Sequence, residues 1–95
     1  MDSKVMEEIV DIIKNTAKHY DIEKVIMFGS RAKGTNNNFS DIDLAVTGDQ
    51  YTDFALALEY EVITLYRFDV HNYNDISTSL RNEINKTGVT IYEKI

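Results

Sequence analysis

Polar and apolar residues follow each other along the chain with periods that predict a series of helices and strands. Residues 3–20 carry a stripe at helical spacing, which is typical of an amphipathic helix with one face on a core. The stripe consists of Val5, Ile9, Ile12, Ile13, Thr16 and Tyr20. Ser3 is a candidate N-cap, and Lys14 and Lys18 near the other end complement the helix dipole. We therefore expect a long first helix on the surface of the fold.

Two strands are expected next. Residues 24–28 are nearly all apolar, which is typical of a short strand buried on both faces of a sheet. Residues 41–46 have the period of two that indicates a strand, and their core-facing side chains are Ile42, Leu44 and Val46. Between the two strands, residues 30–33 can form one helical turn that stops at Gly34.

The second half of the chain predicts a further helix and strand. The helical stripe consists of Tyr51, Phe54, Ala55, Leu58, Val62 and Leu65. After this helix, apolar and polar residues alternate over residues 67–73, which predicts a strand. Phe68 and Val70 face one side of the expected strand, whereas Asp69 and His71 face the other. This strand therefore presents a carboxyl and an imidazole together, away from the core.

A third helix and a last strand close the sequence. Asn74 or Asp75 is the expected N-cap of the helix, Gly88 ends it, and its apolar residues are Ile76, Leu80 and Ile84. Residues 89–92 are expected to be the last strand. The order helix, strand, strand, helix, strand, helix, strand predicts an α/β (α+β) fold. In this fold a small mixed four-stranded sheet has its helices packed on one face and the aspartates on the open face.

Composition limits the class of protein. At 95 residues, with 43% hydrophobic content, the chain is expected to be a single globular domain over residues 1–95. The absence of cysteine excludes a disulfide framework and a thiolate zinc site. The first residues lack an apolar signal region, and no run is long enough to span a bilayer. We therefore expect a cytoplasmic protein without membrane association.

The charge balance narrows the choice of partner. A formal net charge of -6 opposes long-range attraction to a nucleic-acid backbone, so we expect no stable bulk nucleic-acid binding. Divalent cations held by aspartates would offset part of this charge at a phosphate site. The remaining acidity favours a basic protein partner and a hetero-oligomer.

The clearest candidate for chemistry is a Gly-Ser pair placed ten residues before two alternating aspartates. Gly29 and Ser30 follow the first expected strand, so their backbone N–H groups can face phosphate oxygens from a tight turn. Asp41 and Asp43 lie two residues apart, which places their carboxylates on one face of a strand, roughly 7 Å apart. Carboxylate oxygens and substrate phosphates together suit Mg²⁺. The pattern predicts a site that holds a nucleotide and transfers part of it.

A third acid completes the expected site. Asp69 alternates with Phe68 and Val70, so it joins Asp41 and Asp43 if the two strands are neighbours. Three clustered carboxylates repel one another, and metal ions relieve that repulsion. In a two-metal site the ions clamp the attacking and leaving oxygens of an in-line displacement at phosphorus. Asp69 would then complete the coordination of the ion that activates the incoming hydroxyl, or take its proton directly.

Residues 28–46 resemble the minimal nucleotidyltransferases of the DNA polymerase beta superfamily. The shared pattern is Gly-Ser, ten residues and Asp-x-Asp, followed by a third acid at Asp69, and the match includes Arg31, Gly34, Ser40 and Leu44. Residues 88–93 also resemble the close of such domains. The resemblance implies a polymerase beta-like palm fold.

The same resemblance implies roles for individual residues. It assigns the triphosphate of ATP to Gly29 and Ser30, two Mg²⁺ ions to Asp41 and Asp43, and activation of the acceptor to Asp69, which also serves as a metal ligand. Small stand-alone members are typically encoded beside a HEPN-family ribonuclease toxin. They act as antitoxins that transfer AMP from ATP to a tyrosine of that toxin.

Several interpretations stay open at this point. Arg31 either contacts a phosphate or is a solvent-exposed cation, and Asp75 competes with Asp69 as the third acid. His71 is interpreted as a half-buried structural histidine that could border the acceptor. A non-catalytic antitoxin that only binds its partner is one alternative function. Transfer to a small molecule such as an aminoglycoside is another, which the lack of a second domain disfavours.

Overall fold

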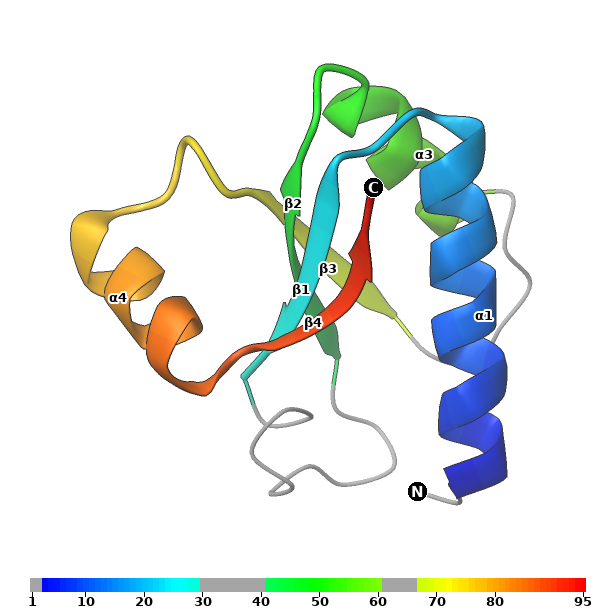
Figure 1. The fold of residues 1–95 in the computed structure, drawn as a ribbon, viewed down its shortest axis with the longest axis horizontal. Coiled ribbons are helices and arrows are strands. Elements are labelled where there is room, and N and C mark those ends of the chain that lie inside the picture. Colours follow the sequence, from blue (N-terminus) through cyan, green and yellow to red (C-terminus); the bar gives the residue numbers. More distant parts are fainter. Residues whose placement is uncertain (1–2, 30–40, 61–66) are drawn as a thin grey trace.

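The expected order of helices and strands is confirmed by a computed structural model, which describes residues 3–29, 41–60 and 67–95 (Figure 1). The elements are α1 (Ser3–His19), β1 (Lys24–Phe28), β2 (Ile42–Thr47), α3 (Tyr51–Tyr60), β3 (Phe68–Asn72), α4 (Thr78–Thr87) and β4 (Val89–Glu93). The expected turn at residues 30–33, and the end of the second helix at Val62 and Leu65, lie outside the described residues.

The four strands form one mixed sheet in the order β3-β2-β1-β4. β1 is antiparallel to both of its neighbours, β2 and β4. β2 and β3 are parallel, and α3 makes the connection between them. The mixed four-stranded sheet expected from the sequence is therefore confirmed. The parallel pair is the part of it that carries the acidic residues.

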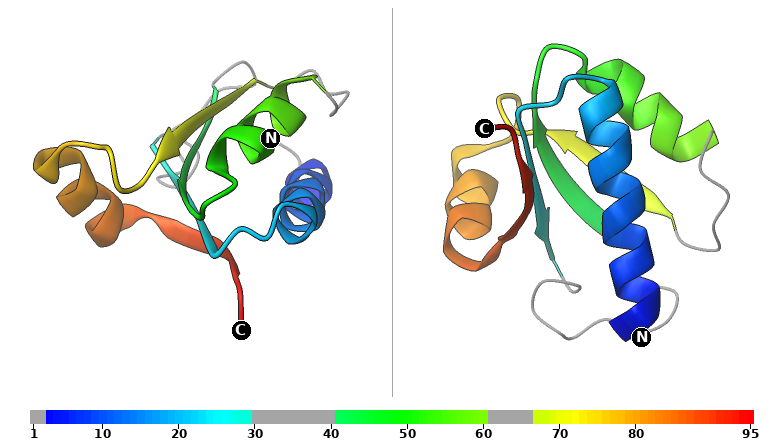
Figure 2. Two further views of the ribbon diagram at one scale, coloured as in Figure 1. Left: turned by 90° about the horizontal axis from the view of Figure 1, so that it is seen from above. Right: turned by 45° about the vertical axis from the view of Figure 1, so that its right-hand side comes forward.

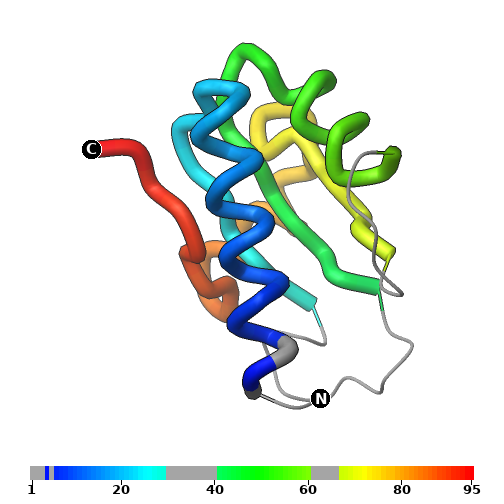
Figure 3. Tube along the Cα trace, turned by 90° about the vertical axis from the view of Figure 1, so that its right-hand side faces the viewer, coloured from blue at the N-terminus to red at the C-terminus, as the bar shows by residue number. Residues whose placement is uncertain are grey.

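Helices α1 and α3 cover one face of this sheet, and Figure 3 shows them side by side in front of it. The side chains between the helices and the sheet are apolar and buried, because alternate residues of β1 and β2 point to this face. This core contains Ile9, Ile13, Ala17, Ile22, Val25, Met27, Ile42, Leu44, Val46, Phe54 and Leu58. Most of this core consists of positions that the sequence pattern predicted, whereas Ala17 and Ile22 were not among them.

Helix α4 lies on the opposite face of the sheet (Figure 2). A second cluster of buried residues, Phe28, Ala45 and Ile84, joins it to β1 and β2. The fold class is as expected, but this helix corrects the expectation that all helices pack on one face. The physical reason lies in β1, because a strand that is apolar on both sides needs cover on both sides. The acidic face is therefore partly covered.

The start of α4 differs from the sequence-based expectation. Ser77 is the N-cap, and its hydroxyl accepts a hydrogen bond from the backbone N–H of Leu80 at 3.1 Å. Asn74 and Asp75 were expected in this role, but both belong to the preceding turn. There the Asn72 side chain accepts from the Asn74 N–H at 3.1 Å. Because Asn74 and Asp75 form part of the turn, the N-cap lies two or three residues later than expected.

The other helix end follows the expectation. Gly88 ends α4, and its N–H donates to the carbonyl of Ile84 at 2.7 Å. A side chain at Gly88 would overlap both that carbonyl and Ile26 of β1, so the close approach of helix and strand requires glycine. Within residues 3–29, 41–60 and 67–95, no helix combines the length and the apolar character needed to cross a membrane.

Candidate active site

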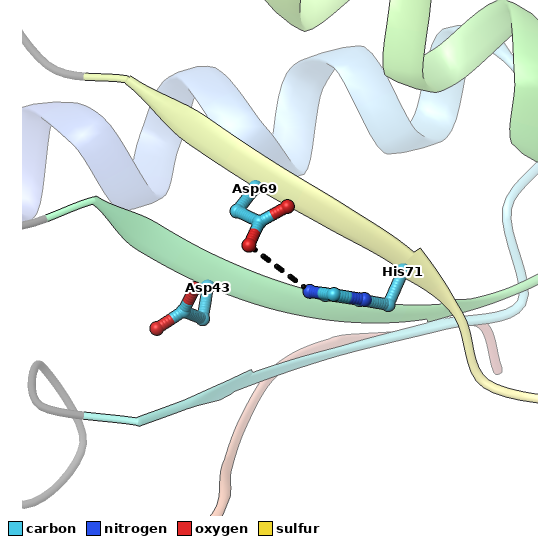
Figure 4. Close-up of side chains that lie close together, drawn as sticks. All are labelled: Asp43, Asp69 and His71. Carbon is cyan, nitrogen blue, oxygen red and sulfur yellow. Dashed lines mark ion pairs between the residues drawn. The ribbon is translucent and has the colours of Figure 1, made fainter. Parts of the chain in front are cut away.

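Asp43 and Asp69 lie directly opposite each other on neighbouring strands. The parallel register of β2 and β3 pairs Asp43 with Asp69, and pairs Leu44 with Val70 one residue further on. Because successive side chains point to opposite faces, Leu44 and Val70 enter the core while both carboxyls point to the other face (Figure 4). The close approach of two acids is thus set by sheet register.

His71 joins the two aspartates. Its Nε2 lies 3.2 Å from Oδ2 of Asp69, and one ligand atom from each of the three residues lies within 4.8 Å of the others (Figure 4). The imidazole ring also packs on the ring of Phe28, with 5.5 Å between the centroids. The neighbour of His71 in the sheet register is Ala45, whose small side chain leaves room for the ring. The histidine is half-buried, as expected, and it also faces the acids.

Asp41 stands apart from this cluster. β2 begins at Ile42, so Asp41 precedes the strand and is exposed. Among the described residues, the group whose ligand atoms converge is Asp43, Asp69 and His71. Asp41 still acts on the site through its charge, since it is one of the carboxylates that raise the pKa of Asp43. The Asp-x-Asp motif thus has one member inside the cluster and one at its edge.

Burial and neighbouring charges shift the pKa of Asp43. Partial burial raises the pKa of its carboxyl above the ordinary value, and the negative charges of Asp69 and Asp41 raise it further. The nearby imidazole of His71 acts in the opposite direction. Ionisation of Asp43 is therefore less favourable than that of an aspartate in water. A cation placed between Asp43 and Asp69 would offset this penalty.

Gly29 closes one side of the site. Its φ of +76° is in the left-handed region that favours glycine. A Cβ at this position would overlap Oδ2 of Asp43. The backbone that follows β1 therefore lies too close to this carboxylate for a residue with a side chain. The backbone of Gly29 suits the tight turn that is expected at the Gly-Ser pair. Ser30 and Arg31 lie outside the described residues.

Tyr51 holds the site from the opposite face of the sheet. Its hydroxyl donates to the backbone carbonyl of Val70 at 2.9 Å, which ties the start of α3 to β3. Burial raises the pKa of this phenol, and the charges of Asp69 and Asp75 add to the effect. Sequence reasoning placed Tyr51 in the helical stripe but did not identify this bond. A side-chain bond to a backbone carbonyl has no signature in residue spacing.

Side chains of α4 contact Tyr73, the residue directly after β3. Nη2 of Arg81 donates to the carbonyl of Tyr73 at 3.2 Å, and its guanidinium lies 5.3 Å from the centroid of the Tyr73 ring. The Tyr73 hydroxyl donates to Oδ1 of Asn85 at 2.8 Å. Helix α4 is thereby attached to the end of the strand that carries Asp69 and His71.

Comparison with known proteins agrees with this geometry. A sequence model of the family described as "Polymerase beta, Nucleotidyltransferase" matches residues 8–95. A protein of Methanocaldococcus jannaschii named "putative protein adenylyltransferase" is 32% identical over 65 residues, which are 68% of this chain and 64% of that protein. The chain thus spans a little less than two thirds of that relative.

Two solved structures share the fold. One, described as a "putative minimal nucleotidyltransferase", has a TM-score of 0.73 at 22% identity, covering 94% of this chain and 95% of the other. The second, a toxin-antitoxin with AMP-PNP, has a TM-score of 0.69 at 22% identity, covering 90% of this chain and 73% of the other.

The family match and the shared fold identify the class of this protein as a nucleotidyltransferase. The chain belongs to the polymerase beta nucleotidyltransferase family.

Proposed function

We propose that the protein is an antitoxin that transfers AMP from ATP to a tyrosine of a HEPN-family ribonuclease toxin in a divalent-metal-dependent reaction, and so neutralises it. The observation that carries the proposal is the register of Asp43 with Asp69 beside the backbone of Gly29. The adenylyltransferase name of the curated relative supports the choice of reaction. The toxin-antitoxin neighbour supports the choice of partner. The tyrosine acceptor and the HEPN class rest on the family resemblance of the sequence.

The residues of the site fit a divalent ion. Asp43 and Asp69 offer carboxylate oxygens, which are the ligands that Mg²⁺ prefers. Burial and the charges of Asp69 and Asp41 raise the pKa of Asp43, and a cation bound beside it would offset this penalty on its ionised form. Asp41, Asp43 and Asp69 would hold two divalent ions. When bound, such ions supply positive charge to the attacking and leaving oxygens of a displacement at phosphorus.

The turn after β1 would hold the nucleotide. Gly29 has no side chain and a left-handed backbone, so its peptide can approach a phosphate beside Asp43. We assign Ser30 and Arg31 to the same triphosphate, as the sequence motif implies. The triphosphate would then be held next to the carboxyls of Asp43 and Asp69.

Asp69 would act on the acceptor. Its side chain is 53% exposed, so an incoming tyrosine hydroxyl can reach it. The hydroxyl oxygen forms a bond to the α-phosphorus of ATP, the bond from that phosphorus to the bridging oxygen breaks, and pyrophosphate leaves. The proton of the hydroxyl passes to the carboxylate of Asp69. The product is a tyrosine that carries AMP.

A labelling experiment tests this reaction. The protein is incubated with a HEPN-family partner, Mg²⁺ and ATP labelled at either the α- or the γ-phosphorus. Transfer of AMP places the α label on the partner and releases the γ label as pyrophosphate, and replacing the acceptor tyrosine of the partner by phenylalanine abolishes labelling. A partner labelled only from the γ position would indicate a kinase. A partner that is neutralised without any label would indicate an antitoxin that works by binding alone.

A further inference from the structure

The imidazole of His71 has no part in the reaction proposed above, yet it lies inside the acidic cluster. Its Nε2 and the carboxylate oxygens of Asp43 and Asp69 converge within 4.8 Å. These three residues come from two adjacent strands of a parallel pair, so the sheet fixes their relative positions. The cluster therefore offers a nitrogen donor as well as two oxygen donors.

The position of the ring suits metal coordination. Two ligand atoms that each lie about 2.1 Å from one ion, at right angles, are about 3.0 Å apart. Nε2 of His71 lies 3.2 Å from Oδ2 of Asp69, close to that separation. Contact with the Phe28 ring holds the imidazole in place, and the side chain is 33% exposed. The pair of Nε2 and Oδ2 therefore already has nearly the separation of two ligands of one ion.

A mixed donor set changes which ion is preferred. Mg²⁺ binds oxygen ligands almost exclusively, whereas imidazole nitrogen favours first-row transition ions such as Mn²⁺, Co²⁺ and Zn²⁺. We infer that Nε2 of His71 is a ligand of the ion held between Asp43 and Asp69, and that it makes this position selective for a divalent transition ion over Mg²⁺. The inference rests on the metal site of the proposed function.

The alternative role for His71 is an ion pair with Asp69 that only orients the carboxylate. Both roles require the same 3.2 Å contact, so loss of activity in a His71 variant would not separate them. Direct detection of a nitrogen bound to the metal does separate them. Mn²⁺ is a suitable probe because it is paramagnetic, and pulsed electron paramagnetic resonance reports ¹⁴N nuclei bonded to it.

The experiment uses the full chain with Mn²⁺ alone, and compares the parent with His71→Gln and His19→Gln. His19 is the other histidine of the chain and lies exposed at the end of α1, so it is the matched control. We expect histidine ¹⁴N coupling in the parent and in His19→Gln, and none in His71→Gln. The affinity for Mn²⁺ should fall about tenfold or more in His71→Gln, while the affinity for Mg²⁺ changes less than about twofold.

Bound Mn²⁺ without ¹⁴N coupling in the parent protein overturns the inference, and this result does not depend on whether His71→Gln folds. Equal losses of Mn²⁺ and Mg²⁺ affinity in His71→Gln would overturn the selectivity. The proposed function fails separately. If the parent shows ¹⁴N coupling but transfers no AMP, His71 is a metal ligand and the proposed reaction is wrong. If the parent transfers AMP but bound Mn²⁺ shows no ¹⁴N coupling, the reaction stands and His71 is not a ligand.

Discussion

Gly29 illustrates how one missing side chain shapes the site. Its left-handed backbone and its overlap with Asp43 if a Cβ is added both select glycine at the end of β1. The two effects can be separated, because backbone strain belongs to Gly29 alone whereas the overlap needs the Asp43 carboxylate. The separation makes the position suitable for a double-mutant cycle.

We predict that Gly29→Ala lowers the free energy of unfolding by about 1–3 kcal/mol and lowers turnover about 100-fold. In an Asp43→Ala background the same substitution should destabilise the protein less, since the overlapping carboxylate is gone and only the strain remains. Urea unfolding of the four proteins measures the coupling. Equal destabilisation in both backgrounds would show that the backbone of Gly29 does not crowd Asp43.

The raised pKa of Asp43 gives a pH dependence with a defined sign. An acid with a higher pKa in the folded than in the unfolded state contributes stability below the unfolded value, near 3.8, and loses it as pH rises through the folded value. Without metal, Asp43→Asn should therefore be more stable than the parent at pH 7, and this advantage should shrink as pH falls toward 3.8.

Urea unfolding in excess chelator at several pH values measures this difference. Asp11→Asn, which alters an exposed carboxyl in the middle of α1, is the control and should show a smaller change. An Asp43→Asn protein that is less stable than the parent at pH 7 would contradict the repulsion inferred between the carboxylates. The same variant should have lost AMP transfer, so stability and activity change in opposite directions.

At the scale of single elements, the helix ends carry local interactions that can be tested in isolation. We predict that Ser77→Ala lowers the free energy of unfolding by about 1 kcal/mol, because the Leu80 N–H loses its acceptor. Ser79→Ala is the matched control, as Ser79 is exposed inside the same helix, where alanine is the better helix former. Chemical unfolding that shows the same loss for both variants would mean that Ser77 is not the cap.

The Tyr51 hydroxyl adds one hydrogen bond to the apolar packing of α3 against the sheet. Tyr51→Phe should lower the free energy of unfolding by about 1 kcal/mol, because the carbonyl of Val70 loses its side-chain donor. Tyr60→Phe is the control, since Tyr60 lies at the far end of α3 and is 75% exposed. If the two variants unfold at the same urea concentration, the hydroxyl of Tyr51 does not hold α3 to the strand.

At the scale of the whole molecule, periodicity predicted which residues form elements but not how all of them pack. The order of elements and the main core could be derived because a helical or strand period is local. The position of α4 could not, since a helix with one apolar stripe can pack on either face of a sheet. The apolar character of both sides of β1 was the available signal that the second face also needs cover.

The sequence also predicted part of the candidate site. The Gly-Ser and Asp-x-Asp motifs identified Gly29 and Asp43 as neighbours, and alternation placed Asp69 on the same face. The contact of His71 with Asp69 was not predicted, because it depends on the sheet register and on rotamers that spacing does not encode. The contact of Arg31 with a phosphate stays a prediction, because Arg31 lies outside the described residues.

The most direct test of the proposed reaction is the intact mass of a HEPN-family partner produced together with the parent, Asp69→Asn or Asp75→Asn. Asp75 is the matched control because it is an exposed acid in the turn after β3, outside the cluster of converging ligand atoms. We predict that the partner gains the mass of at least one AMP with the parent and with Asp75→Asn, and gains none with Asp69→Asn. Neutralisation of the partner by all three proteins with no mass change would contradict the transfer reaction.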